Sequence, residues 1–161
     1  MLKPALLYKE ELEKKFTECM YDDEYCLYMG YVHGHELPKI EPQDNVYQWA
    51  IVDKAKLIGW FAYRIQPETD MVYNFGLYSF DKGNPIIGID VFNKMEKLVR
   101  NFRRIEWRAL STNPTVKHYD KFCQKHNGNK VILHKVGKTP DGSYWDDIIY
   151  EIVKAENEDK E

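Results

Sequence analysis

The fold is decided by residues 71–119, where five segments follow one another: MVYNFGLYSF (71–80), DKGN (81–84), PIIGIDVFNKMEKLVRNF (85–102), RIEWRAL (104–110) and TNPTVKHY (112–119). The first segment is rich in aromatic and branched residues and predicts a strand, and the second predicts a turn. The third predicts a helix, the fourth a second strand, and the fifth opens another helix. A small α/β unit of this order can build a site for a phosphate-bearing cofactor.

The predicted helix has a clear start and one apolar stripe. Asn84 is a natural N-cap, and Pro85 suits the first helical position because its missing N–H would have no partner there. The N–H groups of the first turn, those of Ile86, Ile87 and Gly88, and the positive end of the helix dipole could bind an anion. Lys82 is close to them in sequence. The apolar residues recur at helical spacing and should pack on a sheet: Val91, Phe92, Met95, Leu98, Val99 and Phe102.

The next two segments repeat this logic. Residues 104–110 alternate apolar and charged side chains, which is the period of a strand with one buried face. Thr112-Asn113-Pro114 repeats the cap-and-proline signal, and the helix after it should end at Gly128. Its apolar face includes Tyr119.

The rest of the chain adds helices before this unit and strands on both sides of it. We predict an amphipathic helix over residues 6–20, a short helix over 25–32, and strands over 47–53, 57–65, 131–136 and 144–153. No linker or internal repeat interrupts the pattern. Residues 1–153 are therefore expected to form a single domain, followed by a polar tail over 154–161.

Composition excludes several classes of protein. The 161 residues are 30% charged and 43% apolar, which is ordinary for a globular domain and leaves no membrane-spanning run. A net charge of −3 without a basic stripe does not suggest nucleic-acid binding. The three cysteines have no metal-type spacing, and the start of the chain does not resemble a signal peptide, so the cytoplasm is the expected location.

The order of two helices, three strands, helix, strand, helix and two strands resembles the GNAT superfamily of acyl-CoA-dependent N-acetyltransferases, over nearly the whole chain. The resemblance implies an α+β fold, a three-layer α/β/α domain around a mixed, mostly antiparallel sheet. It also implies acetyl-CoA as co-substrate and a small-molecule or peptide amine as acceptor. No metal, nucleic acid or membrane partner is expected. A homodimer could form through an exposed edge strand or an aromatic patch.

The resemblance assigns site residues. In the family the fourth strand bulges away from the fifth, and the cofactor arm lies in the opening, so Gly76 is expected at the bulge. The strand backbone at Leu77, Tyr78 and Ser79, and the turn with Lys82, Gly83, Ile87 and Gly88, would hold the cofactor. Asn113 would contact its arm. Tyr119 would protonate the departing thiolate, although a core position on its helix explains this tyrosine equally well.

The chain also departs from the family. The usual loop is Gln or Arg, two residues, Gly, one residue, then Gly or Ala, whereas here a proline stands between Gly83 and Gly88. No first strand is evident before the first helix. The strand over 71–80 has no carboxylate, so Glu106 is the nearest candidate base, unless it pairs with Arg104 or Arg108, or Asn74 or Tyr73 orients a water.

Two further readings therefore stay open. The same scaffold could be a non-catalytic binding or interaction module, and an unrelated α+β domain could share the element order by chance. A metal site at His33, His35 and Glu36 is a weaker interpretation than a solvated turn.

Overall fold

The computed structural model describes residues 1–22, 37–139 and 141–154. Its centre is a sheet of seven strands in the order β1-β2-β3-β4-β5-β7-β6. All neighbouring strands in it are antiparallel except the parallel pair β4 and β5. The strands are β1 (Leu2–Pro4), β2 (Val46–Asp53), β3 (Lys56–Gln66), β4 (Met71–Ser79), β5 (Arg104–Leu110), β6 (Asn129–Lys138) and β7 (Tyr144–Val153).

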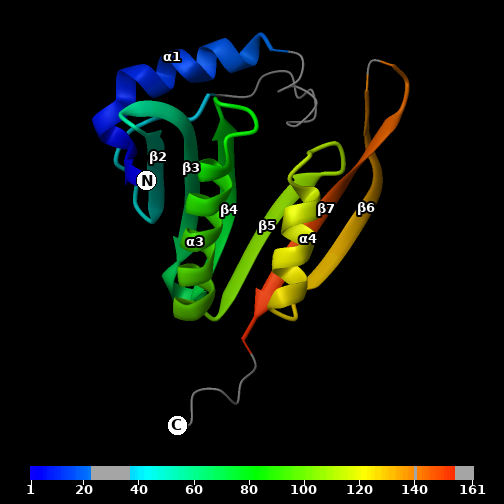
Figure 1. Cartoon of the computed structure of the whole chain (residues 1–161). Helices are drawn as coiled ribbons and strands as arrows, with labels where there is room; N and C mark the ends of the chain where they lie inside the picture. Colours follow the sequence, from blue (N-terminus) through cyan, green and yellow to red (C-terminus); the bar gives the residue numbers. More distant parts are fainter. Residues whose placement is uncertain (23–36, 140, 155–161) are drawn as a thin grey trace.

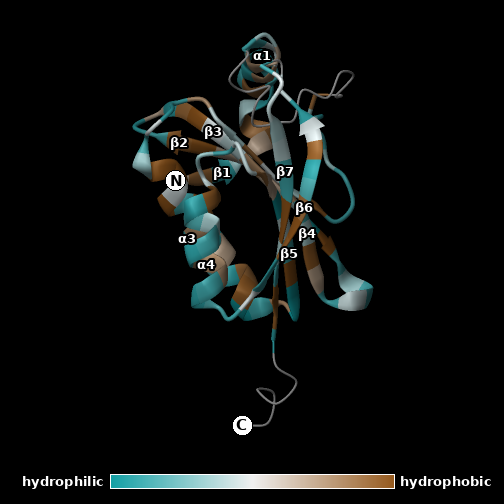
Figure 2. Cartoon of the chain, turned by 90° about the vertical axis from the view of Figure 1, so that its right-hand side faces the viewer, coloured by the Kyte–Doolittle hydropathy of each residue, from teal (hydrophilic) through white to brown (hydrophobic). Residues whose placement is uncertain are grey.

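Helices cover both faces of this sheet. Figure 2 shows α3 (Pro85–Asn101) and α4 (Val116–Lys125) on one side of it. The helix α1 (Lys9–Met20), preceded by a short 3-10 turn (Ala5–Tyr8), packs on the other face of the first strands. There Leu12 and Phe16 are fully buried against Ala50, Trp60 and Ala62. The three-layer α/β/α arrangement that the resemblance implies is therefore confirmed.

Most predicted elements are present with small shifts at their ends. The strands over 104–110 and 144–153 begin and end where the sequence places them, and α3 begins at Pro85 after the cap at Asn84. The expectation of no first strand is wrong, because β1 pairs with the edge of β2 through Leu2 and Ile51. The predicted helix over 25–32 and the histidines at 33 and 35 lie outside the described residues. None of the helices in the described ranges is both long and apolar enough to cross a bilayer.

The strand β4 carries a bulge. Its pairing with β3 joins Ala62 to Gly76 and Arg64 to Tyr73, so β4 has one extra residue between those pairs. Asn74 lies there with a positive φ of 53°, a conformation that asparagine tolerates better than most residues. The bulge is thus at Asn74 and Phe75, not at Gly76 as predicted.

Gly76 has another reason to be glycine. A Cβ atom at this position would lie 2.7 Å from the Trp60 ring, which packs over the strand from β3. The glycine therefore makes room for an indole.

The bulge precedes the point where β4 and β5 part. The two strands pair at Met71 with Arg104 and at Val72 with Ile105, and the register goes no further. Beyond it, β4 stays paired with β3 up to Ser79, and β5 stays paired with β7 up to Leu110. The expected divergence of the fourth and fifth strands is confirmed, and Figure 1 shows the two ribbons separating toward the end where α3 and α4 begin.

Candidate functional site

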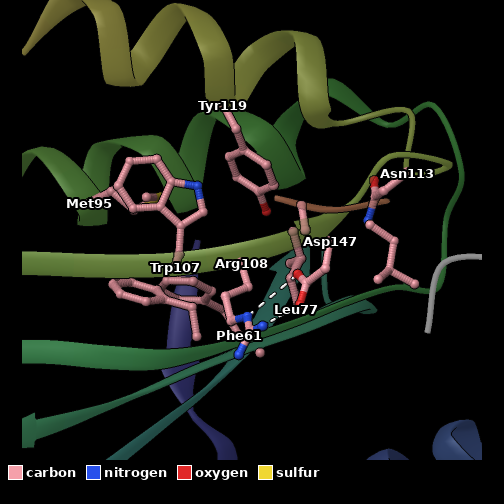
Figure 3. Close-up of a pocket in the computed structure, with 12 residues that line it drawn as sticks. Phe61, Leu77, Met95, Trp107, Arg108, Asn113, Tyr119 and Asp147 are labelled. Carbon is pink, nitrogen blue, oxygen red and sulfur yellow. Dashed lines mark hydrogen bonds and ion pairs between the residues drawn. The ribbon is translucent and has the colours of Figure 1, made fainter. Parts of the chain in front are cut away.

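A cavity of about 210 Å³ lies between the diverging strands. Its walls come from β3, β4, β5, β7, α3, α4 and the segment before α4, so elements far apart in the sequence meet there (Figure 3). Apolar and aromatic side chains form most of the lining, with four polar side chains among them. The lining residues are Phe61, Phe75, Gly76, Leu77, Met95, Trp107, Arg108, Ala109, Leu110, Asn113, Tyr119 and Asp147.

The edge of β4 toward this cavity presents backbone groups. Phe80 donates its N–H to the carbonyl of Ile58 on β3 at 2.8 Å. Because alternate residues of a strand direct their backbone groups to opposite sides, those of Leu77 and Ser79 face the opening rather than β3. Leu77 and Ser79 are two of the residues predicted to hold a cofactor through their backbone. The third, Tyr78, directs its side chain to the α1 side, where it contacts Phe16 and Trp60.

Tyr119 is placed on the inward face of α4. Its side chain is 9% exposed, and its ring contacts Phe92, Trp107 and Tyr150. Figure 3 shows the hydroxyl directed into the cavity. Burial raises the pKa of Tyr119 to about 12, so the phenol keeps its proton at neutral pH. The two interpretations from the sequence are therefore compatible, since one tyrosine packs in the core and also presents an O–H group to the cavity.

Asn113 also lines the cavity, and its carboxamide oxygen shapes the start of α4. That oxygen accepts from the Thr115 N–H at 2.9 Å and from the Thr115 hydroxyl. The predicted cap position is wrong by two residues, because α4 begins at Val116 with Thr115 at its N-cap, and Asn113 closes the turn before it. The side chain is held in place by the helix start, so its position at the cavity is fixed.

The turn between β4 and α3 is only partly as predicted. The side chain of Asn84 accepts from the Ile86 N–H at 3.0 Å, and its carbonyl accepts from the Ile87 N–H at 3.3 Å. Two of the three N–H groups that the sequence offered for an anion, those of Ile86 and Ile87, are therefore already bonded to the cap residue. The side chain of Ile87 is buried in the core.

Three other turn residues are more open. Gly83 has a φ of +82°, which explains the glycine. Gly88 is helical, and a Cβ atom there would have no neighbour within 4 Å, so the surface of the first turn has room for a ligand. The Lys82 ammonium lies 3.5 Å from the carboxylate of Asp22, two residues after the end of α1, so it is directed toward α1.

Glu106 does not line the cavity. Its carboxylate lies 2.9 Å from Arg104, which also contacts Glu151 on β7 at 2.7 Å. This is the ion pair that the sequence offered as the alternative to a base. Its catalytic role stays a prediction that this geometry does not favour.

Sequence reasoning missed one charged pair. Arg108 on β5 and Asp147 on β7 both line the cavity, and they form a two-point contact through Nε and Nη2 of the arginine. The side chain of Asp147 is 13% exposed and that of Arg108 is 55% exposed. Adjacent aspartates at 146 and 147 in a predicted strand were a usable signal, because one of them must face each side of the sheet. The pairing with Arg108 needed the register of β5 and β7.

Trp107 was likewise not predicted as a site residue. It is 2% exposed, and its indole N–H has no hydrogen-bond partner among the described residues. Figure 3 shows this nitrogen on the edge of the ring that faces Tyr119. A buried donor without a partner costs about 1–3 kcal/mol, and a ligand carbonyl in the cavity would remove that cost. No cluster of three or more potential metal ligands occurs within the described ranges.

Comparison with known proteins supports the fold. No protein-family model matches the sequence, and no curated protein matches it. An N-acetyltransferase from Staphylococcus aureus Mu50 has a TM-score of 0.64 at 13% identity, over 95% of this chain and 97% of that chain. A probable GNAT-family acetyltransferase from Chromobacterium violaceum ATCC 12472 has a TM-score of 0.63 at 13% identity, over 95% and 85%.

A third similar structure is an acetyl transferase from Salmonella typhimurium that modifies the N-terminal serine of a 50S ribosomal subunit protein. It has a TM-score of 0.59 at 12% identity, over 96% of this chain and 94% of that chain. At such identities the likeness concerns the fold, and this chain has the GNAT fold. A different α+β fold that shares only the element order is therefore excluded.

Proposed function

We propose that the protein is an N-acetyltransferase that moves the acetyl group of acetyl-CoA to an amine of a small molecule or a peptide. The observation that carries this proposal is the parting of β4 and β5 after Val72 and Ile105, with a cavity between them that Asn113 and Tyr119 line. A cleft with unpaired strand backbone on one side and apolar walls suits an extended thioester arm.

We assign each part of this co-substrate to a group of described residues. The backbone at Leu77 and Ser79 would bond the amide groups of the arm. The open first turn of α3 at Gly88, with Lys82 in the turn before the helix, would receive the phosphates. The unpartnered Trp107 N–H faces the same cavity and would donate to a carbonyl there.

In the reaction the amine nitrogen would attack the thioester carbonyl carbon, and the carbon–sulfur bond would break. Tyr119 would give its proton to the departing sulfur, since its hydroxyl is directed into the cavity and stays protonated. The attacking nitrogen would lose one proton to water as the amide forms, and water would return a proton to the Tyr119 phenolate. The amine must be unprotonated to attack. For a lysine-like amine with a pKa near 10.4, removing the proton at pH 7 costs about 4–5 kcal/mol.

Titration calorimetry with acetyl-CoA tests the binding step. We expect saturable heat with the folded protein, and no heat at millimolar ligand would end the proposal. The variant Tyr119→Phe tests the acid: kcat should fall by about 10²–10⁴-fold while acetyl-CoA affinity changes little. An unchanged kcat would remove the role assigned to this hydroxyl.

The second candidate is a non-catalytic binding module on the same scaffold. The pairing of Glu106 with Arg104, and the use of the Ile86 N–H by the cap, favour it. A folded protein that binds coenzyme A but acetylates nothing in a broad amine panel would support this candidate over the enzyme.

A further inference from the structure

Among the described residues that line the cavity, Arg108 and Asp147 are the two that carry a full charge, one positive and one negative. Every other side chain there is apolar or neutral and polar at pH 7. The pair lies across from Tyr119, and Figure 3 shows the Tyr119 hydroxyl directed toward the end of the cavity that holds it. A molecule that meets the reacting centre from this end must therefore contact both charges.

The two partners differ in mobility. Asp147 is 13% exposed and belongs to a strand paired on both sides, with β5 and with β6. Arg108 is 55% exposed, and its long side chain reaches Asp147 diagonally, since the residue opposite Arg108 in the sheet is Ile149. The carboxylate is thus a fixed point, and the guanidinium can move away from it without leaving solvent.

A simple amine fits this pair poorly. Its ammonium could bind Asp147 only by displacing Arg108, which would then lose its counter-charge. An amine that also carries a carboxylate keeps every charge paired, because its ammonium takes Asp147 and its carboxylate takes Arg108. Arginine binds carboxylates through two parallel N–H groups, so the second contact also fixes the orientation of the acceptor.

We propose that Arg108 and Asp147 form the acceptor-recognition site, and that the acceptor is a small zwitterion of the α-amino-acid type with its amine and carboxylate on neighbouring atoms. This inference rests on the proposed acetyl transfer. Asp147 holds the ammonium at the end of the cavity opposite Tyr119, and Arg108 selects the carboxylate. After the amine gives its proton to solvent, its nitrogen lies beside the reacting thioester.

The test uses matched acceptors: free α-amino acids and the corresponding amino-acid amides, which keep the amine but lack the carboxylate. With the full-length protein and saturating acetyl-CoA, we expect kcat/KM to be at least tenfold higher for one or more free acids than for the matching amides. Arg108→Gln should lower kcat/KM for the acid by about 10- to 100-fold and leave the amide nearly unchanged. Asp147→Asn should lower both.

Two control variants separate recognition from structure. Arg104→Gln and Glu151→Gln break an ion pair between the same two strands, on the same face, but away from the cavity. They should leave the preference for the acid as it is in the parent chain. All four variants should bind acetyl-CoA with the parent affinity in calorimetry, which shows that each is folded.

The outcomes distinguish this inference from the function on which it rests. If the parent chain binds no acetyl-CoA, the proposed function itself fails, and the acceptor site fails with it. If acetyl-CoA binds and amines are acetylated, two results overturn the acceptor site alone: a preference for amides or for peptide N-termini, or an equal loss for acid and amide in Arg108→Gln. If acetyl-CoA binds and no acceptor in the panel is acetylated, the catalytic function and the acceptor site fail together.

Discussion

The two edges of β4 have opposite surroundings. Along β3 the strand is paired from Met71 to Ser79, whereas along β5 it is paired only at Met71 and Val72. Buried backbone groups need hydrogen-bond partners, and β3 supplies them on the closed edge. On the open edge the same strand faces a cavity with polar side chains at its ends. The difference shows that one strand can complete a core on one side and build a binding cleft on the other.

Side-chain packing follows the same division. On the closed edge, Trp60 lies over Gly76 and meets Phe16 and Tyr78 in a cluster of rings under α1. On the open edge, the rings of Trp107 and Tyr119 leave room between them and β4. Mutations at the closed edge should therefore lower the free energy of unfolding, and mutations at the open edge should lower ligand affinity.

The largest effect is expected from Trp60→Ala. This side chain is 6% exposed, and removing a buried indole costs about 3–5 kcal/mol in the free energy of unfolding. Urea denaturation followed by far-UV circular dichroism measures the loss. Trp49→Ala, a partly buried ring beside Lys94, is the control and should cost less. A loss below about 1 kcal/mol for Trp60→Ala would show that the ring cluster does not hold the closed edge.

Gly76→Ala should have the next largest effect. The added methyl group would lie 2.7 Å from the Trp60 ring, so we expect a loss of about 1–3 kcal/mol from overpacking. A double-mutant cycle sharpens the assignment. In the Trp60→Ala background the cost of Gly76→Ala should disappear, and a cost that persists would place its origin in the backbone instead.

The stability of the protein at alkaline pH depends on a buried tyrosine at each edge of β4. Burial raises the pKa of Tyr78 on the closed edge, and of Tyr119 at the cleft, to about 12. Tyrosines of the unfolded chain titrate near 10, so between pH 10 and 12 the folded state holds protons that the unfolded state has released. The free energy of unfolding should be unaffected by these groups below pH 10 and fall as pH rises above it.

Urea titrations at pH 9, 10 and 11 measure that fall. Tyr78→Phe and Tyr119→Phe should each make it shallower. If the free energy of unfolding of Tyr119→Phe falls with pH as steeply as that of the parent chain, water in the cleft solvates the Tyr119 phenolate. The cleft is then more accessible to water than the burial of Tyr119 indicates.

The smallest effect is expected at Gly88. A Cβ atom there meets nothing within 4 Å, so Gly88→Ala should stabilise the helix by about 0.5–1 kcal/mol through helix propensity. A thermal melt detects this gain. A separate variant, Gly88→Glu, should bind acetyl-CoA more weakly than the parent chain, because the new carboxylate would repel phosphates at the first turn. An unchanged acetyl-CoA affinity in Gly88→Glu would show that the phosphates do not bind at this turn.

The parts of the fold that local patterns encode could be predicted from the sequence. Alternation in RIEWRAL and the Asn-Pro starts placed β5 and α3 within a residue of their ends. The strand β1 was missed because its three residues include a proline and form no pattern of their own, and pairing with β2 makes them a strand. The bulge was placed at Gly76 because glycine is the usual signal, whereas Asn74 has the positive φ.

The candidate site was harder to predict because it depends on register. Asn113 and Tyr119 could be found from the resemblance to the GNAT superfamily, which implies an asparagine and a tyrosine after the fifth strand, and both line the cavity. The contact between Arg108 and Asp147 joins residues 39 positions apart and depends on the diagonal pairing of β5 with β7. Glu106 has the residue type of a base, but its neighbour Arg104 and its place outside the cavity could not be read from composition.

The bulge at Asn74 has one more consequence. The extra residue bends β4 by means of its own backbone, and Trp60 holds the bent strand from behind, so the width of the cleft is set by the hydrophobic core. A ligand would find this cleft preorganised, and little conformational entropy would be lost when it binds. The affinity for a ligand in the cleft is therefore coupled to the rigidity of the aromatic cluster around Trp60.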